Sequence, residues 1–436
     1  MKVMSVETAE GTRSESQNGT TARPASQHIY FPLIALAAFG LYWSSSLLLE
    51  ARNGTTHFGA DTWFYGELAK GNVFDRIADN YYLDRIFRFH PTTVVMAAGW
   101  MKIVAPLTPW IAPQYLFKAM FAAVGAVGVW AAMWAFAAVV PRRYATLWGA
   151  IYATSLGVWY FSSIEESKVV TATLTALYIA TYLHLRQRWT THGAVLLTAI
   201  LLLACLNETV AGFLLIIPIV DTLVQRGWDL RHGRWIALHG LAGPVALAIL
   251  EGLMRGRTGA AGAHPEGANH FSMLIWYMSQ NDYSPAGIYS FLVNWFFFNI
   301  AAPSLDASNA PSADPDDKEF FDAALTNYFS SPVSASLVVL FAAMLLAILL
   351  PRYRTESAGN VASILLALLA YALVRGAFFL VFIPGEPLLF SPAVTLAHML
   401  MIGILFMASS FPAKHVLLAG LAVLLFITNG AFVIGR

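Results

Sequence analysis

Apolar residues along this chain arrive in blocks of roughly twenty, the length that a helix needs to cross the hydrocarbon core of a bilayer. Short polar turns separate the blocks. The apolar blocks run approximately over residues 29–49, 112–140, 144–161, 168–185, 194–206, 209–224, 235–254, 333–350, 361–384, 390–411 and 415–434. The pattern predicts an all-α polytopic membrane protein with about eleven transmembrane helices.

Two further apolar blocks, residues 90–107 and 286–304, are ambiguous, and the charges of the short loops decide whether they cross. Lys and Arg in short loops stay on the cytoplasmic side. The loops alternate when the N-terminal tail lies inside and both ambiguous blocks are left out. The loops then predicted inside carry Arg142, Arg143, Arg186, Arg188, Arg226, Arg231, Arg234, Arg352, Arg354 and Lys414. The turns then predicted outside contain Glu165, Glu166, Lys168, Asn207, Glu208 and Glu386.

The same charge pattern predicts that residues 90–107 lie along the membrane surface. If this block alone of the two crossed, the arginine clusters that follow it would face the wrong side. Pro106 and Pro109 also break the block early, which suits an interfacial helix. We expect Trp100 and Trp110 at the depth of the lipid headgroups.

This layout divides the chain into four regions. Residues 1–28 are polar and are predicted to be a disordered cytoplasmic tail. Residues 29–254 form a transmembrane module that includes a first outer loop at 50–111. Residues 255–332 form a second long outer loop, and residues 333–436 form the C-terminal transmembrane helices. Both long loops are expected to bear interfacial helices, and long loops on one side of a membrane usually hold function.

Composition removes several classes of function. The chain is 58% hydrophobic and only 12% charged, with a mean hydropathy of +0.60. Its net charge of +1 does not indicate nucleic-acid binding, and Cys205 as the sole cysteine excludes disulfides within the chain and thiolate metal sites. The histidines are scattered and predict no metal centre. The acidic run 314–319 could attract a divalent cation, although such runs are more often solvated surface.

The first outer loop contains a carboxylate, Asp61, shortly after the first predicted helix. Tyr65 follows four residues later and Glu67 six, the spacing of a short amphipathic helix that begins near Asp61. Asp61 fits two roles equally well. It can cap that helix, or it can serve as a general base held at the water–lipid boundary to deprotonate an acceptor hydroxyl.

Three glutamates follow at outer turns. Glu165 and Glu166 end the third helix beside Lys168, where they form either a solvated hinge or a pair with one raised pKa that orients an acceptor or a metal. Glu208 lies in a polar stretch that is very short for a loop, so partial burial is expected. Because burying an unpartnered Glu is costly, a functional role is favoured for it.

Arg375 lies inside an apolar block, about eight residues below its outer end and so roughly 12–14 Å deep. An arginine at such a depth faces a polar cavity or pairs with a carboxylate. Two partners fit equally well. One is the phosphate of a lipid, which matches the guanidinium fork; the other is Glu386 or Glu208.

The order of these features resembles that of GT-C glycosyltransferases, in the branch of the protein O-mannosyltransferases and aminoarabinose transferases. Their Asp-(Glu)-x-x-Tyr motif is similar to the segment from Asp61 to Tyr65, with Thr62 in place of the second acid. Their surface helix opens with proline, as does the segment at His90-Pro91 here. Their acidic second outer loop resembles the turn at Glu165 and Glu166. The stretch from Leu206 to Pro218 resembles a later element, with Glu208 in place of Lys, and the resemblance covers about residues 29–224.

The resemblance implies an enzyme that transfers a sugar from a polyprenyl-phosphate donor to an acceptor hydroxyl at the outer, periplasmic face. It implies that Asp61 is the general base, with Glu165 or Glu166 across one cavity. The substrate-binding residues expected on this basis are Tyr65, Arg88, His90, Lys168, Glu208, Arg375 and Glu386. The membrane would be a bacterial inner membrane, and the acceptor a glycan, a lipid or a protein. No nucleotide-binding glycine loop occurs, which is consistent with a lipid-linked donor.

The main alternative is a polytopic transporter or lipid flippase, in which Arg375 and Glu208 would line a substrate path. Transporters commonly consist of two related halves. No such halves are visible in this sequence, and both long loops are predicted on one face. A non-catalytic protein on the same scaffold is a third possibility.

Overall fold

The computed structural model of the chain describes residues 30–53, 65, 67–68, 75–76, 87, 89–186, 189–226, 230–255, 275, 278, 283–303, 325–350 and 358–435. The predicted tail 1–28 lies outside the described residues, as do nearly half of the first long loop, most of the second, Arg88 and the acidic run 314–319. Asp61 lies outside them too.

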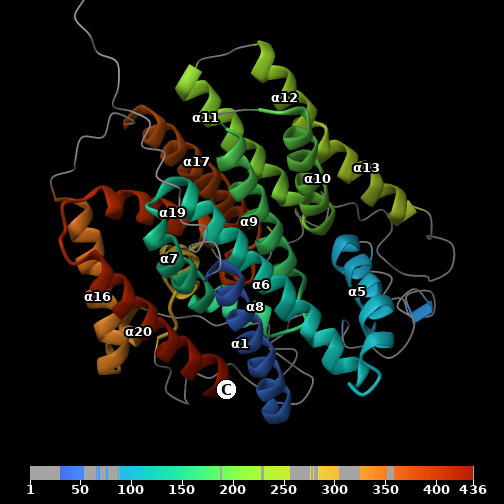
Figure 1. Ribbon diagram of the computed structural model, residues 1–436, viewed down its shortest axis with the longest axis horizontal. Helices are drawn as coiled ribbons and strands as arrows, with labels where there is room; N and C mark the ends of the chain where they lie inside the picture. The colour runs from blue at the N-terminus through green and yellow to red at the C-terminus, as the bar shows by residue number, and fades with distance from the viewer. Residues whose placement is uncertain are drawn as a thin grey trace, which may run out of the picture.

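The regular elements of the described residues are all helical, and they pack as one bundle (Figure 1). The α-helices are α1 (Tyr30–Asn53), α5 (Pro91–Val104), α6 (Pro113–Val139), α7 (Arg142–Thr154), α8 (Leu156–Ser162), α9 (Ser167–Leu185), α10 (Thr191–Asn207), α11 (Ile216–Arg226), α12 (Leu230–Gly240), α13 (Ala242–Arg255), α15 (Pro285–Val293), α16 (Pro332–Ile348), α17 (Ala358–Phe382), α18 (Pro387–Phe390), α19 (Pro392–Ala408) and α20 (Lys414–Gly435). Shorter turns of other helix types are η2 (Ala105–Leu107), η3 (Thr209–Leu215), η4 (Asn294–Phe298) and η6 (Leu325–Phe329).

Several of these helices can cross a membrane, which confirms the predicted class of all-α membrane protein. By length and composition, 5 helical stretches qualify among the described residues. They are Tyr30–Ala51, Pro113–Val139, Gly233–Leu250, Val361–Phe382 and Lys414–Ile434. Five shorter apolar helices accompany them, at Thr191–Asn207, Thr209–Gln225, Pro285–Phe298, Pro332–Ile348 and Pro392–Ala408.

Among the predicted helices, block 209–224 becomes η3 and α11, and block 235–254 is shared by α12 and α13. Block 144–161 is divided into α7 and α8. The break lies at Ser155, whose backbone is extended at φ −64° and ψ 142°. The amides of Leu156 and Gly157, which begin α8, donate to the carbonyl oxygens of Ile300 and Asn299 at 3.0 and 2.8 Å. A segment far along the chain therefore satisfies the amides that the break exposes, as a buried helix end requires.

The two ambiguous blocks form short helices. The block at 90–107 becomes α5, 14 residues long, followed by η2. This is shorter than the ~20 residues that a perpendicular crossing needs. Its surface orientation stays a prediction. The block at 286–304 becomes α15 and the π-turn η4. The end of this block supplies the carbonyl groups that accept hydrogen bonds from the first amides of α8.

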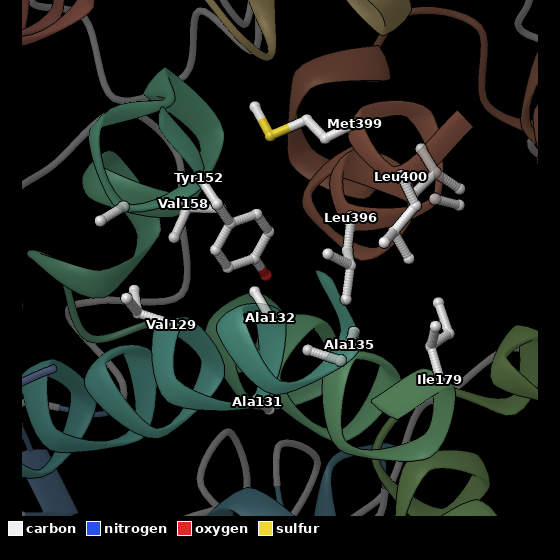
Figure 2. Close-up of a cluster of buried hydrophobic side chains, with 14 of the residues drawn as sticks. Val129, Ala131, Ala132, Ala135, Tyr152, Val158, Ile179, Leu396, Met399 and Leu400 are labelled. Atoms are coloured by element: carbon white, nitrogen blue, oxygen red, sulfur yellow. The ribbon is translucent and has the colours of Figure 1, made fainter. Parts of the chain in front are cut away.

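The centre of the bundle lies where α6, α7, α8, α9 and α19 meet. Figure 2 shows the Tyr152 ring of α7 pointing toward Ala132 of α6 and Leu396 of α19. Small residues let these helices approach closely: a Cβ on Gly128 of α6 would lie 2.7 Å from the Thr173 hydroxyl of α9. Such contacts are the usual means by which helices associate within a membrane.

Successive helices run in opposite directions, so the polar turns that join them lie at two opposite ends of the bundle. We name the ends after one residue each. The Glu208 end holds the starts of α9 and η3 and the end of α10, together with the turn before α18. The Arg142 end holds the start of α7 and the end of α9. There, Arg186 donates two hydrogen bonds to Asp221 at 2.8 and 3.0 Å, and this pair ties α9 to α11.

Candidate functional site

Arg375 of α17 is fully buried at the Glu208 end, and its guanidinium is only partly satisfied. Its Nη2 donates to the carboxylate of Glu208, and also lies 3.5 Å from the carbonyl oxygen of Phe390. Its Nε and Nη1 have no hydrogen-bond partner among the described residues. Of the two carboxylates that the sequence offered as partners, the structure pairs Arg375 with Glu208. Two donor nitrogens, which carry three N–H groups, remain for a further acceptor.

Lys168 of α9 brings a second buried cation to the same place. Its ammonium lies 4.2 Å from the centroid of the Phe390 ring, a cation–π distance. The Phe390 ring also stacks on Phe379 at 4.2 Å between centroids, and the Arg375 guanidinium lies 5.0 Å from the Phe379 ring. The two stacked rings therefore link the two cations, because Lys168 contacts Phe390 and Arg375 contacts Phe379.

Glu208 is buried and ionised between these cations. Burial by itself would raise the pKa of its carboxyl, but Arg375 and Lys168 together lower the pKa below the ordinary value. The short polar stretch in the sequence correctly indicated burial of Glu208. An ionised carboxylate at this position neutralises part of the positive charge.

His90 lies beside this group, just before α5. Its Nδ1 is 2.6 Å from the carbonyl oxygen of Asn207, so in the neutral ring Nδ1 carries the proton. Burial and the Lys168 ammonium lower the pKa of His90 to about 4. The imidazole is consequently neutral near pH 7, with Nε2 as its hydrogen-bond acceptor.

Asn207 fixes helix α5 against the bundle. Its side-chain oxygen accepts hydrogen bonds from the backbone and hydroxyl of Thr93 on α5, at 3.1 and 2.6 Å. Its amide donates to the Ser167 carbonyl and the Thr171 hydroxyl of α9, at 3.0 and 2.9 Å. One buried side chain at the end of α10 therefore sets the position of α5, and with it the position of His90.

The two neighbouring glutamates have different partners. Glu166 caps the first turn of α9, where its carboxylate accepts from the backbone and hydroxyl of Ser167 at 2.8 and 2.9 Å. Glu165 instead forms a buried ion pair with Lys118 of α6 at 2.7 Å, and Glu50 of α1 lies 3.9 Å from the same ammonium. Neither glutamate is the solvated hinge that the sequence allowed.

Of the other residues expected in the site, Tyr65 is buried with its ring 5.8 Å from that of Phe121 on α6. Glu386 is half-buried at the start of α18, next to the turn that carries Phe390. Asp61 and Arg88 lie outside the described residues. The structure thus brings together a group that we call the polar cluster: His90, Glu166, Lys168, Glu208 and Arg375. Glu165 is not part of it, because its carboxylate pairs with Lys118.

Sequence reasoning missed three contributors: Lys118, Asn207 and Phe390. Lys118 carried a usable signal, because it is a lone charge inside the apolar block 112–140, as Arg375 is in block 361–384. The sequence indicates only that Asn207 belongs to a turn. Nothing in the sequence marks Phe390, which is one of several phenylalanines near that turn.

The described residues contain no group of three or more His, Cys, Asp or Glu side chains that could hold a metal ion. Neither protein-family models nor curated proteins give a match to this chain. Chemically, the site offers positive charge in a low-dielectric place. The charge comes from Lys168 and from the two donor nitrogens of Arg375 that lack partners among the described residues. Such an arrangement suits an oxyanion, and a phosphate group above all, because preorganised donors act strongly where water is excluded.

Proposed function

We propose that this protein is a membrane glycosyltransferase that uses a polyprenyl-phosphate-linked sugar as donor and an acceptor hydroxyl at the outer face. The observation that carries the proposal is the buried Arg375, whose Nε and Nη1 lack partners among the described residues. Its partner Glu208 is also stabilised by the charge of Lys168. Charges buried in an apolar helical bundle are costly and mark substrate sites. The resemblance of the segment at Asp61 to the glycosyltransferase motif, and of His90-Pro91 to the start of the family's surface helix, supports the choice of reaction.

In this proposal the donor phosphate binds at the polar cluster and the sugar extends toward the first long loop. Arg375 and Lys168 hold the phosphate, whose negative charge grows as the sugar leaves. Asp61 takes the proton of the acceptor hydroxyl while its oxygen attacks the anomeric carbon in line, which inverts that centre. His90, neutral near pH 7, and the Glu166 cap hold the surface helix and α9 in place around the reacting groups. Tyr65, Arg88 and Glu386 are the remaining contacts proposed for the substrates.

The proposed topology has about eleven crossings in a bacterial inner membrane, with the N-terminus in the cytoplasm and the Glu208 end outside. Cysteine labelling tests it in a background without Cys205. Trp110 and Arg143 are suitable positions because both are exposed and belong to opposite ends of the bundle. An impermeant reagent added to intact cells should label Trp110→Cys and leave Arg143→Cys unlabelled. The reverse pattern would show that the topology is inverted.

One observation favours the alternative of a transporter. Helices interrupted within the bundle, as α7 and α8 are at Ser155, are typical of transporter substrate sites. In this chain, however, the amides at the break already donate hydrogen bonds to the carbonyl groups of Asn299 and Ile300. Those amides are therefore not available to a substrate, which makes the transferase the better-supported proposal.

The experiment that tests the proposed activity is mass spectrometry of the surface glycans of cells with and without the gene. Loss of one sugar residue, restored by the wild-type gene, is the expected result. It identifies both the sugar and the acceptor, whether glycan, lipid or protein. Unchanged glycans together with accumulation of a solute or lipid on one side of the membrane would favour a transporter instead.

A further inference from the structure

The Arg142 end contains a pocket that the proposed transferase reaction does not use. It has a volume of about 270 Å³. Four helices form it: the start of α1, the end of α6, the start of α7 and the end of α9. Its principal lining residues are Tyr30, Trp134, Arg142, Arg143, Thr146 and His184.

The polar side chains of this pocket are suited to an anion. Arg142 and Arg143 occupy the first turn of α7, where the helix dipole also places positive charge. The Thr146 hydroxyl lies one turn further along the same helix. Among the described residues, no carboxylate lines the pocket. Asp221, an acid at this end of the bundle, is already engaged by Arg186, by the Tyr182 hydroxyl at 2.6 Å and by Gln225 at 3.0 Å.

The remaining walls are aromatic and rigid. The imidazole of His184 stacks on Trp134 with 4.3 Å between ring centroids, and its Nδ1 lies 3.0 Å from the Ala180 carbonyl oxygen. Tyr30 begins α1, a helix that qualifies as a membrane span. Leu33 and Leu36, on the same helix, are 55% and 65% exposed. Apolar surface suitable for acyl chains thus continues from the anion-binding wall.

We propose that this pocket binds the phosphodiester headgroup of an anionic membrane phospholipid, whose acyl chains lie along the exposed face of α1. Basic pockets between membrane helices are recognised sites for such headgroups. The two guanidinium groups and the threonine hydroxyl bind the phosphate oxygens, and the aromatic wall packs against the glycerol. The exposed leucines favour a lipid over free inorganic phosphate, which would need only the basic wall. The site is independent of the transferase proposal, because it uses other residues at the opposite end of the bundle.

The test uses the full-length protein in a neutral detergent and native mass spectrometry to count retained lipid. Phosphatidylglycerol and phosphatidylcholine of identical acyl composition are the two probes, and inorganic phosphate is a third arm read by thermal shift. Wild-type protein should retain phosphatidylglycerol in preference to phosphatidylcholine. Phosphate alone should produce a smaller thermal shift than phosphatidylglycerol.

The decisive variant is Arg142→Gln/Arg143→Gln, which keeps hydrogen-bonding side chains and removes both charges. Because both charge-assisted contacts to the phosphate are lost, the affinity for phosphatidylglycerol should fall at least about tenfold. Arg234→Gln is the matched control. It removes the same charge from an exposed position on α12, outside the pocket, and should bind as wild type does.

Three outcomes would overturn the proposal: equal retention of the two lipids by wild type, unchanged binding by the double variant, or an equal loss in Arg234→Gln. An equal thermal shift from phosphate and phosphatidylglycerol would assign the pocket to a free phosphate instead. If the double variant elutes as aggregate, Arg143→Gln alone provides the same comparison, because Arg143 is exposed and its replacement leaves the core intact.

Discussion

Asp61→Asn should lower turnover on a lipid-linked sugar by about 10²- to 10⁴-fold, the usual cost of removing a general base. An acceptor hydroxyl has a pKa far above 7, so the base helps mainly in the transition state, when the proton is leaving. Asparagine keeps the size of the side chain and most of its hydrogen bonds. The folded protein should therefore still bind donor. The measurement is the rate of sugar transfer by purified protein under donor saturation.

Asp75→Asn is the matched control for this experiment. Asp75 belongs to the same predicted outer loop and is exposed, and its replacement should leave the rate unchanged. Glu166→Gln should cost less than Asp61→Asn, because Glu166 caps α9 and does not itself take the proton. Normal turnover by Asp61→Asn would eliminate the proposed mechanism. A comparable loss in Asp75→Asn would show that the loop tolerates no change of charge.

Arg375→Met should destabilise the protein by roughly 3–5 kcal/mol, because it leaves the ionised Glu208 carboxylate buried without its partner. Glu208 is only 8% exposed, so water cannot easily replace the guanidinium. The measurement is thermal or denaturant unfolding in detergent. Arg234→Met is the control, since Arg234 is exposed and a surface change usually stays within about 0.5 kcal/mol. An Arg375→Met protein as stable as wild type would contradict the buried ion pair.

The double variant Arg375→Met/Glu208→Leu separates the structural role of this pair from its proposed binding role. Replacing a buried ion pair by apolar residues of similar volume is often neutral, so most of the lost stability should return. Binding of a polyprenyl-phosphate sugar should stay weak, because the donors proposed to hold the phosphate are gone. If the folded double variant bound this donor as tightly as wild type, the phosphate site would lie elsewhere.

The positions of the helices could be predicted from the sequence because each helix is encoded locally. A block of apolar residues bounded by polar turns needs no distant partner to form a helix in a membrane, since all its backbone bonds are internal. Most of the described helices accordingly lie within or close to the apolar blocks, although three blocks are divided between two elements. The break at Ser155 could not be predicted, because the groups that satisfy it belong to residues Asn299 and Ile300, far along the chain.

The sequence by itself determined that the chain is an all-α membrane protein and that Arg375 and Glu208 lie where a charge needs a partner. Both conclusions follow from the cost of placing charge among apolar residues, which each segment reveals alone. Only the tertiary structure decided how the charges pair: Arg375 with Glu208, and Lys118 with Glu165. The reason is physical. An ion pair depends on distances of a few ångströms between different helices, and those distances are set by how whole helices pack, as Asn207 shows by fixing α5 against α9.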